Sequence, residues 1–244
     1  VKHAMESRAV LIDDICLWRE MNKNHGFDQL LGDSREMKRL YQRIMQVAPT
    51  DSTVMISGES GTGKELFAQA IHATSPRAKG PFIALNCAGI PEHLLESELF
   101  GYQRGAFTDA KQSKPGRFQL AEGGTLFLDE LPSLSAALQS KVLTAIEDHV
   151  IRRVGSNRMK PVDVRIIAAT NADLRKLIAA GRFREDLFYR LNVVETHMPA
   201  LRERKEDIPL LIEHCIKRLN RELGKNVQAF SDDVFELFAQ YDWP

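Results

Sequence analysis

The stretch GESGTGKE, residues 58–65, follows a short apolar run, Val54–Ser57, and leads into a run with helical periodicity, Glu65–Thr74. A phosphate-binding loop requires this order of strand, glycine-rich loop and helix. The glycines let backbone N–H groups converge on phosphate oxygens, and the helix N-terminus adds partial positive charge. Lys64 would neutralise charge on the terminal phosphates. The stretch therefore predicts an α/β fold that binds a nucleotide.

One position in this loop departs from the usual pattern. Glu65 stands where a Ser or Thr normally supplies a hydroxyl ligand for Mg²⁺, so Thr62 or water would have to help. Carboxylates after another apolar run, Thr125–Asp129, provide the other half of the site. Asp129 suits magnesium, directly or through water, and Glu130 suits the orientation and deprotonation of an attacking water. The second carboxylate favours hydrolysis, because a kinase must exclude water.

Strand-like runs alternate with helical stretches along the chain. The predicted strands are Val54–Ser57, Phe82–Leu85, Thr125–Asp129, Val164–Ala169 and Val193–Thr196, and the helices between them are Glu65–Thr74, Pro91–Phe100, Ser135–Asp148 and Asp173–Ala180. Continuous apolar strands joined by helical crossovers predict a five-stranded parallel sheet between helices. In such sheets ligands bind beyond the carboxyl ends of the strands.

Further helices are expected in the sequence before the first strand and after the last strand of this sheet. Ser34 is a candidate cap for a helix that Pro49 stops, and another helix runs from Asp207 to about Leu223. Ser231 signals the start of a last one. We therefore predict a helical linker at 1–26, an α/β subdomain at 27–203 and a helical subdomain at 204–244.

Polar residues stand at the ends of other predicted strands. Thr170 and Asn171 follow Val164–Ala169, and Asn86 follows Phe82–Leu85. Each could contact the terminal phosphate or the attacking water, although capping is a common role for both residue types. Arg184 and Arg190 lie six residues apart. Their spacing fits a solvated, salt-bridged helix as well as two arginines that reach a neighbouring subunit's phosphate.

Composition limits the classes of partner. Lys and Arg together number 33, as do Asp and Glu, so the net charge is zero, which argues against gripping nucleic acid by bulk charge. No apolar run approaches the roughly 18 residues of a membrane span, and VKHAMESRAV lacks a signal pattern. We expect a fragment of a cytoplasmic protein. Scattered cysteines, Cys16, Cys87 and Cys215, predict buried reduced thiols.

The run GAFTDA, residues 105–110, sets an aromatic ring, Phe107, among small residues. No apolar periodicity assigns this ring to a core. An aromatic side chain gives a large contact area at small entropic cost, and small neighbours let a loop move. The run therefore indicates either a contact loop or a mobile surface loop with an isolated aromatic residue.

Together these motifs resemble the central AAA+ ATPase domain of bacterial enhancer-binding proteins, the signal-responsive activators of sigma-54 RNA polymerase. The resemblance covers residues from about 27 to the end of the chain. It rests on LLGDS (30–34), GESGTGKE (58–65), NCAGIPEHLLESELFG (86–101), GAFTDA (105–110), GGTLFLDE (123–130), FREDLFYRL (183–191) and LRERKEDI (201–208). It implies a P-loop AAA+ fold with a helical lid, ATP and Mg²⁺ as cofactors, a hexameric ring, and the sigma-54 holoenzyme as partner.

The resemblance also implies roles for single residues. The nucleotide would be bound by Gly58, Glu59, Ser60, Gly61, Thr62, Gly63, Lys64 and Glu65, with Leu31 and Gly32 beside the adenine. Asp129 would hold magnesium. Catalytic roles would fall to Glu130 as the activator of water, Asn86 as its check, Thr170 and Asn171 as sensors, and Arg184 and Arg190 as fingers from the neighbouring subunit.

Contact with sigma-54 would fall to a loop in the ring pore: Gly105, Ala106, Phe107, Thr108, Asp109 and Ala110. Residues 151–156 would form a second pore loop. Asp109 departs from the family's usual glycine and adds a charge and a Cβ at the tip, which bears on the fit to sigma-54 but not on ATP chemistry. The lid is expected to be incomplete at its C-terminus, and enhancer DNA to be bound only through a helix-turn-helix domain absent from this chain.

Two other functions stay open at this point. One is a AAA+ chaperone or loader with a different client, and the other is a nucleotide-gated scaffold or repressor that assembles without remodelling. The GAFT loop argues against the first. Intact Glu130, Arg184 and Arg190 argue against a loss of hydrolysis in the second, although they do not address coupling through Asp109.

Overall fold

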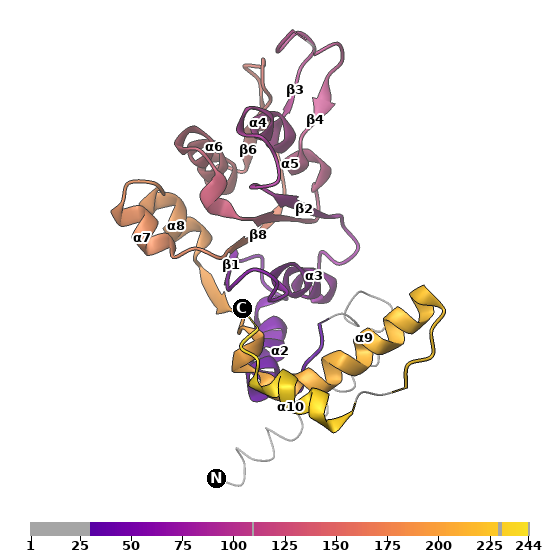
Figure 1. Cartoon of the computed structure of the whole chain (residues 1–244). Helices are drawn as coiled ribbons and strands as arrows, with labels where there is room; N and C mark the ends of the chain where they lie inside the picture. The colour runs from indigo at the N-terminus through magenta and orange to yellow at the C-terminus, as the bar shows by residue number, and fades with distance from the viewer. Residues whose placement is uncertain (1–29, 109, 229–230, 244) are drawn as a thin grey trace.

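A computed structural model describes residues 30–108, 110–228 and 231–243. The predicted linker at 1–26 and Asp109 lie outside the described residues. Five strands form one parallel sheet in the order β2-β5-β8-β1-β9, which confirms the predicted sheet. Their bounds are β1 Val54–Ser57, β2 Phe82–Asn86, β5 Thr125–Asp129, β8 Arg165–Thr170 and β9 Val194–His197. Because β1 lies inside the sheet, between β8 and β9, the phosphate loop begins beside the carboxyl ends of two other strands (Figure 1).

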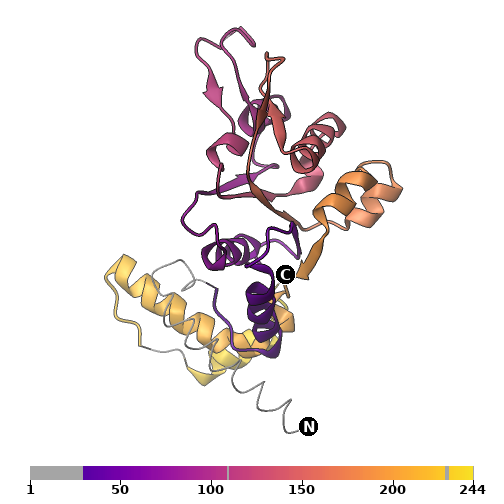
Figure 2. The ribbon, with the colours of Figure 1, turned by 180° about the vertical axis from the view of Figure 1, so that it is seen from behind.

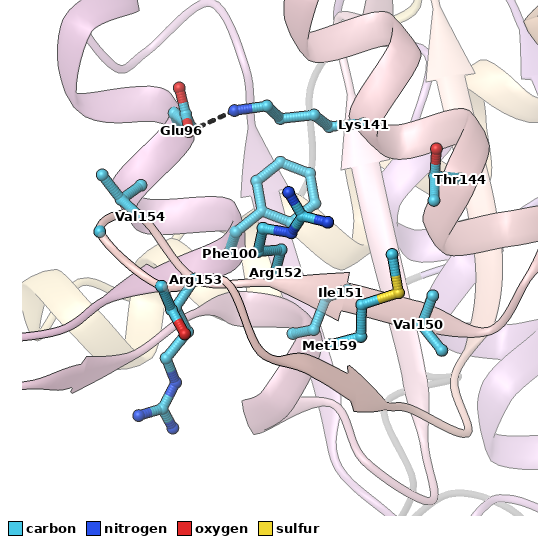
Figure 3. A pocket seen from close by; sticks show the side chains of 12 residues that line it. Glu96, Phe100, Lys141, Thr144, Val150, Ile151, Arg152, Arg153, Val154 and Met159 are labelled. Atoms are coloured by element: carbon cyan, nitrogen blue, oxygen red, sulfur yellow. Dashed lines mark hydrogen bonds and ion pairs between the residues drawn. The ribbon is translucent and has the colours of Figure 1, made fainter.

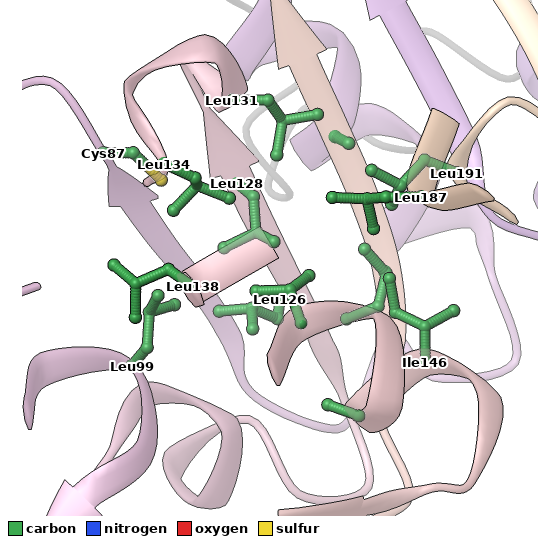
Figure 4. Close-up of a cluster of buried hydrophobic side chains, with 14 of the residues drawn as sticks. Cys87, Leu99, Leu126, Leu128, Leu131, Leu134, Leu138, Ile146, Leu187 and Leu191 are labelled. Atoms are coloured by element: carbon green, nitrogen blue, oxygen red, sulfur yellow. The ribbon is translucent and has the colours of Figure 1, made fainter. Parts of the chain in front are cut away.

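Alternate residues of the strands pack into two separate hydrophobic cores, one on each face of the sheet. Leu126 and Leu128 of β5 pack with the helices α4 (Glu92–Phe100), α6 (Ala136–Glu147) and α8 (Glu185–Leu191), as Figure 4 shows for part of this cluster. Phe127 packs on the other face, with α2 (Arg35–Val47) and α3 (Lys64–Thr74). The period of two along a strand produces this three-layer arrangement.

The remaining helices are short or lie beyond the sheet. Their bounds are α5 Arg117–Leu120, α7 Leu174–Ala179, α9 Ile208–Leu223 and α10 Asp232–Gln240, with 3₁₀ turns η2 Leu131–Ser133, η3 Leu201–Glu203 and η4 Lys205–Asp207. Ser34 caps α2 as predicted, since its hydroxyl accepts from the N–H of Met37 at 3.3 Å. The predicted helices and strands end within one or two residues of their observed bounds.

Two small strand pairs were not predicted from the sequence. The strands β3 (Gly101–Tyr102) and β4 (Lys114–Pro115) pair antiparallel, as do β6 (Val150–Arg152) and β7 (Met159–Pro161). Figures 1 and 2 show both pairs at the end of the molecule opposite α9 and α10. We call residues 101–116 and 150–161 together the tip. Such short strands carry too few residues for an alternating pattern to appear.

The helical part after residue 204 is less well covered than expected. Along the predicted apolar face of α9, Ile208 is buried, but Leu219 is 43% exposed and Cys215 is exposed. The prediction of a buried thiol at Cys215 was therefore wrong, because an apolar stripe becomes a core only where another element covers it. Cys87 is buried, and this burial raises the pKa of its thiol to about 12. In the described part of the chain, no helix has the length and apolar character needed to cross a membrane.

Candidate nucleotide site

The phosphate loop connects β1 to α3 at the carboxyl edge of the sheet. The N–H of Gly58 donates to the carbonyl of Thr170 at 3.2 Å, which ties the start of the loop to β8. A Cβ at Gly58 would lie 2.8 Å from the carbonyl oxygen of Met198, so the close approach requires glycine. Gly63 caps α3 with φ of +94°, a left-handed conformation that glycine adopts without strain. The sequence therefore folds here into a nest of backbone N–H groups at a helix N-terminus.

Lys64 is the buried cation of this loop. Its side chain turns back, and Nζ donates to the carbonyls of Gly58 at 3.0 Å and Glu59 at 2.9 Å. These carbonyls hold the ammonium at the centre of the loop, where phosphate oxygens can compete for its donors. The hydroxyl of Thr62 donates to the same Glu59 carbonyl at 2.8 Å. Glu65 points along the helix, and its carboxylate accepts from Gln69 at 3.2 Å.

A cavity of about 440 Å³ lies between the phosphate loop and the helical part of the chain. Its walls are formed by Leu30, Leu31, residues 59–63, Leu66, Ala200, Leu201, Arg204, Leu211, Tyr241 and Trp243. Apolar side chains thus face the polar loop, which is the combination that a nucleotide base and its phosphates need. Leu31 lines this cavity, whereas Gly32 is not among the lining residues and its carbonyl accepts from the hydroxyl of Tyr41 at 3.3 Å.

Asp129 and Glu130 stand at the same sheet edge, at the end of β5. Asp129 faces Asn86 across the register of β5 and β2, and its Oδ1 accepts from the N–H of Glu130 at 2.9 Å. Glu130 has φ of +55°, a sparsely populated conformation for a residue with a side chain. Burial, and then the neighbouring charge of Asp129, raise the pKa of Glu130. The pair thus combines an oxygen ligand for a cation with a carboxylate that holds a proton more readily than usual.

The polar residues at the other strand ends take part in local hydrogen bonds. The side-chain oxygen of Asn86 accepts from the N–H groups of Ala88 at 2.9 Å and Gly89 at 3.1 Å. The hydroxyl of Thr170 is buried and accepts from the N–H of Ala172 at 3.0 Å. Asn171 is exposed. Capping is therefore one role of Asn86 and Thr170. Thr170 ends β8, which lies beside β1 and the phosphate loop, whereas Asn86 ends β2 at the far edge of the sheet, next to Asp129 of β5.

Arg184, which directly precedes α8, and Arg190, within α8, differ in their surroundings. Arg184 donates to both carboxylate oxygens of Asp186, at 3.0 and 2.6 Å, and to the hydroxyl of Ser140 at 2.9 Å. Arg190 is exposed and has no hydrogen bond or ion pair within the described residues. The expected salt bridge is thus present at Arg184, while the guanidinium of Arg190 is exposed and has no partner among the described residues.

The GAFTDA segment is the loop between β3 and β4. Phe107 is 43% exposed, and its ring centroid lies 4.9 Å from that of Tyr102. The N–H of Gly105 donates to the carbonyl of Ala110 at 2.9 Å, which closes the loop. The predicted second loop at 151–156 lies beside it, because Val154 accepts from Gln103 at 3.0 Å and donates to Gly101 at 2.9 Å. The structure therefore brings these two segments together.

A second cavity, also of about 440 Å³, lies away from the phosphate loop (Figure 3). It is enclosed by α4, α6 and the β6–β7 pair, with Phe100, Ile151 and Met159 among its apolar walls. An ion pair between Lys141 and Glu96, 2.6 Å long, crosses one side of it. No residue of the phosphate loop lines this cavity, whereas residues 59–63 line the first one.

Three charged residues of LRERKEDI lie in or near the walls of the nucleotide cavity, and their positions were not predicted from the sequence. Arg202 pairs with Glu59 of the phosphate loop, Arg204 lines the cavity, and Asp207 is 1% exposed beside α2. Charged residues that directly precede a helix look like solvated caps in a sequence. Their burial depends on α2 and the loop, which are distant in the chain.

Two protein-family models match most of the chain. The Sigma-54 interaction domain family model matches residues 30–197, and the AAA+ ATPase lid domain model matches residues 202–244. The transcriptional regulatory protein ZraR of Salmonella typhimurium is 52% identical over 88% of this chain and 49% of that protein. The Nif-specific regulatory protein of Herbaspirillum seropedicae is 47% identical over 93% of this chain and 42% of that protein.

A similar solved structure is that of NtrX from Brucella abortus in complex with ATP. It has a TM-score of 0.83 and 40% identity, and the alignment covers 97% of this chain and 52% of NtrX. The chain thus spans about half the length of these relatives.

Proposed function

The chain belongs to the family of sigma-54 interaction domains, and from this premise we propose that it hydrolyses ATP to ADP and phosphate in order to remodel the closed sigma-54 RNA polymerase complex at a promoter. The observation that carries the proposal is the meeting of the Lys64 loop with Asp129 and Glu130 at one sheet edge. We place the α/β subdomain at 27–203 and the lid at 204–244, and we expect the protein to act in the cytoplasm.

The residues at this edge divide the work of hydrolysis. The N–H groups of the loop and the ammonium of Lys64 bind the phosphates. The carboxylate of Asp129 is the kind of oxygen ligand that Mg²⁺ prefers, and the ion would neutralise charge on the phosphates. Glu130 orients the attacking water and accepts its proton, and its raised pKa suits that role. Asn86 would hold Glu130 in check, and Thr170 and Asn171 would respond to the terminal phosphate.

The GAFTDA loop is the proposed contact with sigma-54. Phe107 offers an exposed ring on a loop with small neighbours, supported by Tyr102. A ring of this kind can fill a pocket on a partner at low entropic cost. Ordering of the loop would depend on bound ATP, as a population shift driven by the terminal phosphate.

Retention of purified sigma-54 on the immobilised chain tests this function. We expect retention with a transition-state analogue of ATP hydrolysis, and its loss in Phe107→Ala, while that variant hydrolyses ATP at nearly the unchanged rate. Absence of retention together with intact hydrolysis would instead indicate an ATPase with another client. Loss of hydrolysis in Phe107→Ala would assign Phe107 a structural role.

Arg184 and Arg190 are proposed to act on ATP bound to the neighbouring subunit, which requires a closed ring. Arg190→Ala should lower the turnover rate by roughly 10³-fold or more if it acts as such a finger. Lys64→Ala should also be inactive, because its own cavity lacks the phosphate-binding cation.

A mixture of these two inactive variants provides the decisive measurement. A Lys64→Ala subunit still carries Arg190, and it can complete the intact cavity of an Arg190→Ala neighbour. We expect the mixture to regain ATP hydrolysis that neither variant shows alone. A mixture no more active than its components would refute action between subunits.

A further inference from the structure

The turn between the sheet and the lid, residues 201–207, carries three charged side chains that contact two other segments of the chain. Arg202 forms an exposed pair with Glu59, at the start of the phosphate loop, with one contact of 2.8 Å. Arg204 donates to the carbonyl of Thr62, farther along the loop, at 3.4 Å. Asp207 binds the segment that leads into α2. One short turn thus connects the loop, the start of α2 and the lid helix α9.

The carboxylate of Asp207 forms hydrogen bonds with the segment before α2. Its Oδ1 accepts from the N–H of Asp33 at 2.5 Å and of Ser34 at 2.7 Å, and its Oδ2 accepts from the hydroxyl of Ser34 at 2.7 Å. A carboxylate at a helix N-terminus is well placed for both hydrogen bonding and charge. Asp207 therefore fixes Leu30 and Leu31, which line the cavity, against the first turn of the lid.

Arg204, in contrast, is buried, and most of its N–H groups lack a good hydrogen-bond acceptor. The residue is 9% exposed, its Nε has no partner, and its Nη1 is 3.0 Å from the sulfur of Met37, a weak acceptor. Burial lowers the pKa of Arg204, and the charge of Asp207 partly opposes this effect. A guanidinium stays charged in a protein, so a buried one needs compensation from nearby negative charge. The oxygens of Asp207 are already shared with Asp33 and Ser34.

We propose that Arg204 is a positioning residue for ATP: from behind the phosphate loop it holds Thr62 against the lid, and its buried charge favours a polyanion in the cavity. This inference rests on the proposed function, in which the cavity binds ATP. The negative charge of a bound nucleotide offsets the buried positive charge of Arg204. It thereby stabilises the contact through which Arg204 connects the phosphate loop to the turn before α9. Because such coupling is reciprocal, weakening the link weakens the binding of ATP.

The test compares Arg204→Met with Arg202→Met in the 244-residue chain. Both substitutions keep an unbranched side chain and remove one positive charge close to the loop, but the Arg202 pair is exposed and contributes little. The dissociation constants for ATP and for adenosine are measured by competition, together with the melting temperature without nucleotide. We expect Arg204→Met to weaken ATP binding roughly tenfold, a size typical of a lost hydrogen bond to a charged group. Arg202→Met should stay within about twofold.

The binding of adenosine shows whether Arg204 acts on the phosphates of ATP or only on the packing of the cavity. Arg204→Met should leave adenosine binding nearly unchanged, because adenosine carries no phosphate. Equal weakening of ATP and adenosine, or a lower melting temperature with unchanged ATP binding, would overturn the proposal in favour of a packing role. Failure of the unmodified chain to bind ATP would instead refute the proposed function.

Arg204→Lys keeps the test decisive if Arg204→Met does not fold. Lysine preserves the charge but cannot reach two partners with a planar fork. We expect ATP affinity between those of the unmodified chain and a charge-free variant, with adenosine binding unchanged. ATP affinity equal to that of the unmodified chain would show that the guanidinium hydrogen bond to Thr62 is not needed.

Discussion

The carboxyl edge of the sheet and the tip are built in opposite ways. Asp129 and Glu130 follow a strand whose central residues, Leu126, Phe127 and Leu128, are at most 1% exposed. Phe107 stands on a loop between two-residue strands and touches one aromatic neighbour. Residues at strand ends inherit the rigidity of the core, whereas a loop with few buried contacts opens at low free-energy cost. Fixed geometry thus suits the proposed phosphate chemistry at the edge, and the few contacts of Phe107 suit the proposed change of partner at the tip.

Glu130→Gln should produce the largest effect at the carboxyl edge of the sheet: it should slow ATP hydrolysis and leave the tip unchanged. Glutamine keeps the shape of the side chain but cannot accept the proton of the attacking water. We expect the rate of phosphate release to fall by about 10²–10⁴-fold, the usual contribution of a general base, with the dissociation constant for ATP nearly unchanged. Glu147→Gln, which alters an exposed carboxylate at the end of α6, is the matched control. Substantial turnover by Glu130→Gln would refute the assigned role.

The pH dependence of hydrolysis checks the same carboxylate. A base works only when it is deprotonated, and the pKa of Glu130 is raised above the usual 4.5 by burial and by Asp129. Activity should therefore decline as the pH falls through this raised pKa, at a higher pH than for an ordinary glutamate. The profile of kcat/KM against pH measures it, and an acidic limb at or below 4.5 would contradict the expectation.

The edge could be predicted from the sequence because its signals are local. GESGTGKE combines the turn, the helix start and the lysine in eight consecutive residues, and Asp129 and Glu130 directly follow an apolar run. In a parallel sheet the carboxyl ends of the strands lie at one edge, so both segments are expected there even before the order of the strands is known. Residues such as Leu126 and Phe127 could be assigned to a strand without knowing which neighbour each would meet.

The tip and the turn at 201–207 could not be predicted in the same way. The strands of the tip have two or three residues each, and in the β3–β4 pair the close approach of the two backbones requires Gly101 and Gly116. The burial of Arg204 and Asp207 depends on Thr62 and Ser34, which lie more than a hundred residues earlier. Contacts of this kind leave no period in a sequence, so only the folded chain reveals them.

Gly155→Ala should produce a smaller effect, confined to the tip. Gly155 has φ of +76°, and a Cβ there would lie 2.8 Å from the Cβ of Ala106, so the second loop packs on the GAFTDA loop only through glycine. Strain and overlap together should disfavour this packing by roughly 1–2 kcal/mol. If the packed arrangement orients Phe107, retention of sigma-54 should weaken by about tenfold, while ATP hydrolysis stays unchanged.

Gly123→Ala is the control that separates backbone strain at a positive φ from steric overlap of the added Cβ. Gly123 has nearly the same φ, +72°, but no atom lies within 4 Å of a Cβ placed there. This control should retain sigma-54 as well as the unmodified chain, because its strain lies at the start of β5 and touches neither loop. Reduced ATP hydrolysis in Gly155→Ala would show that the tip and the edge are coupled even without the partner. Unchanged retention would show that Phe107 finds sigma-54 without support from the second loop.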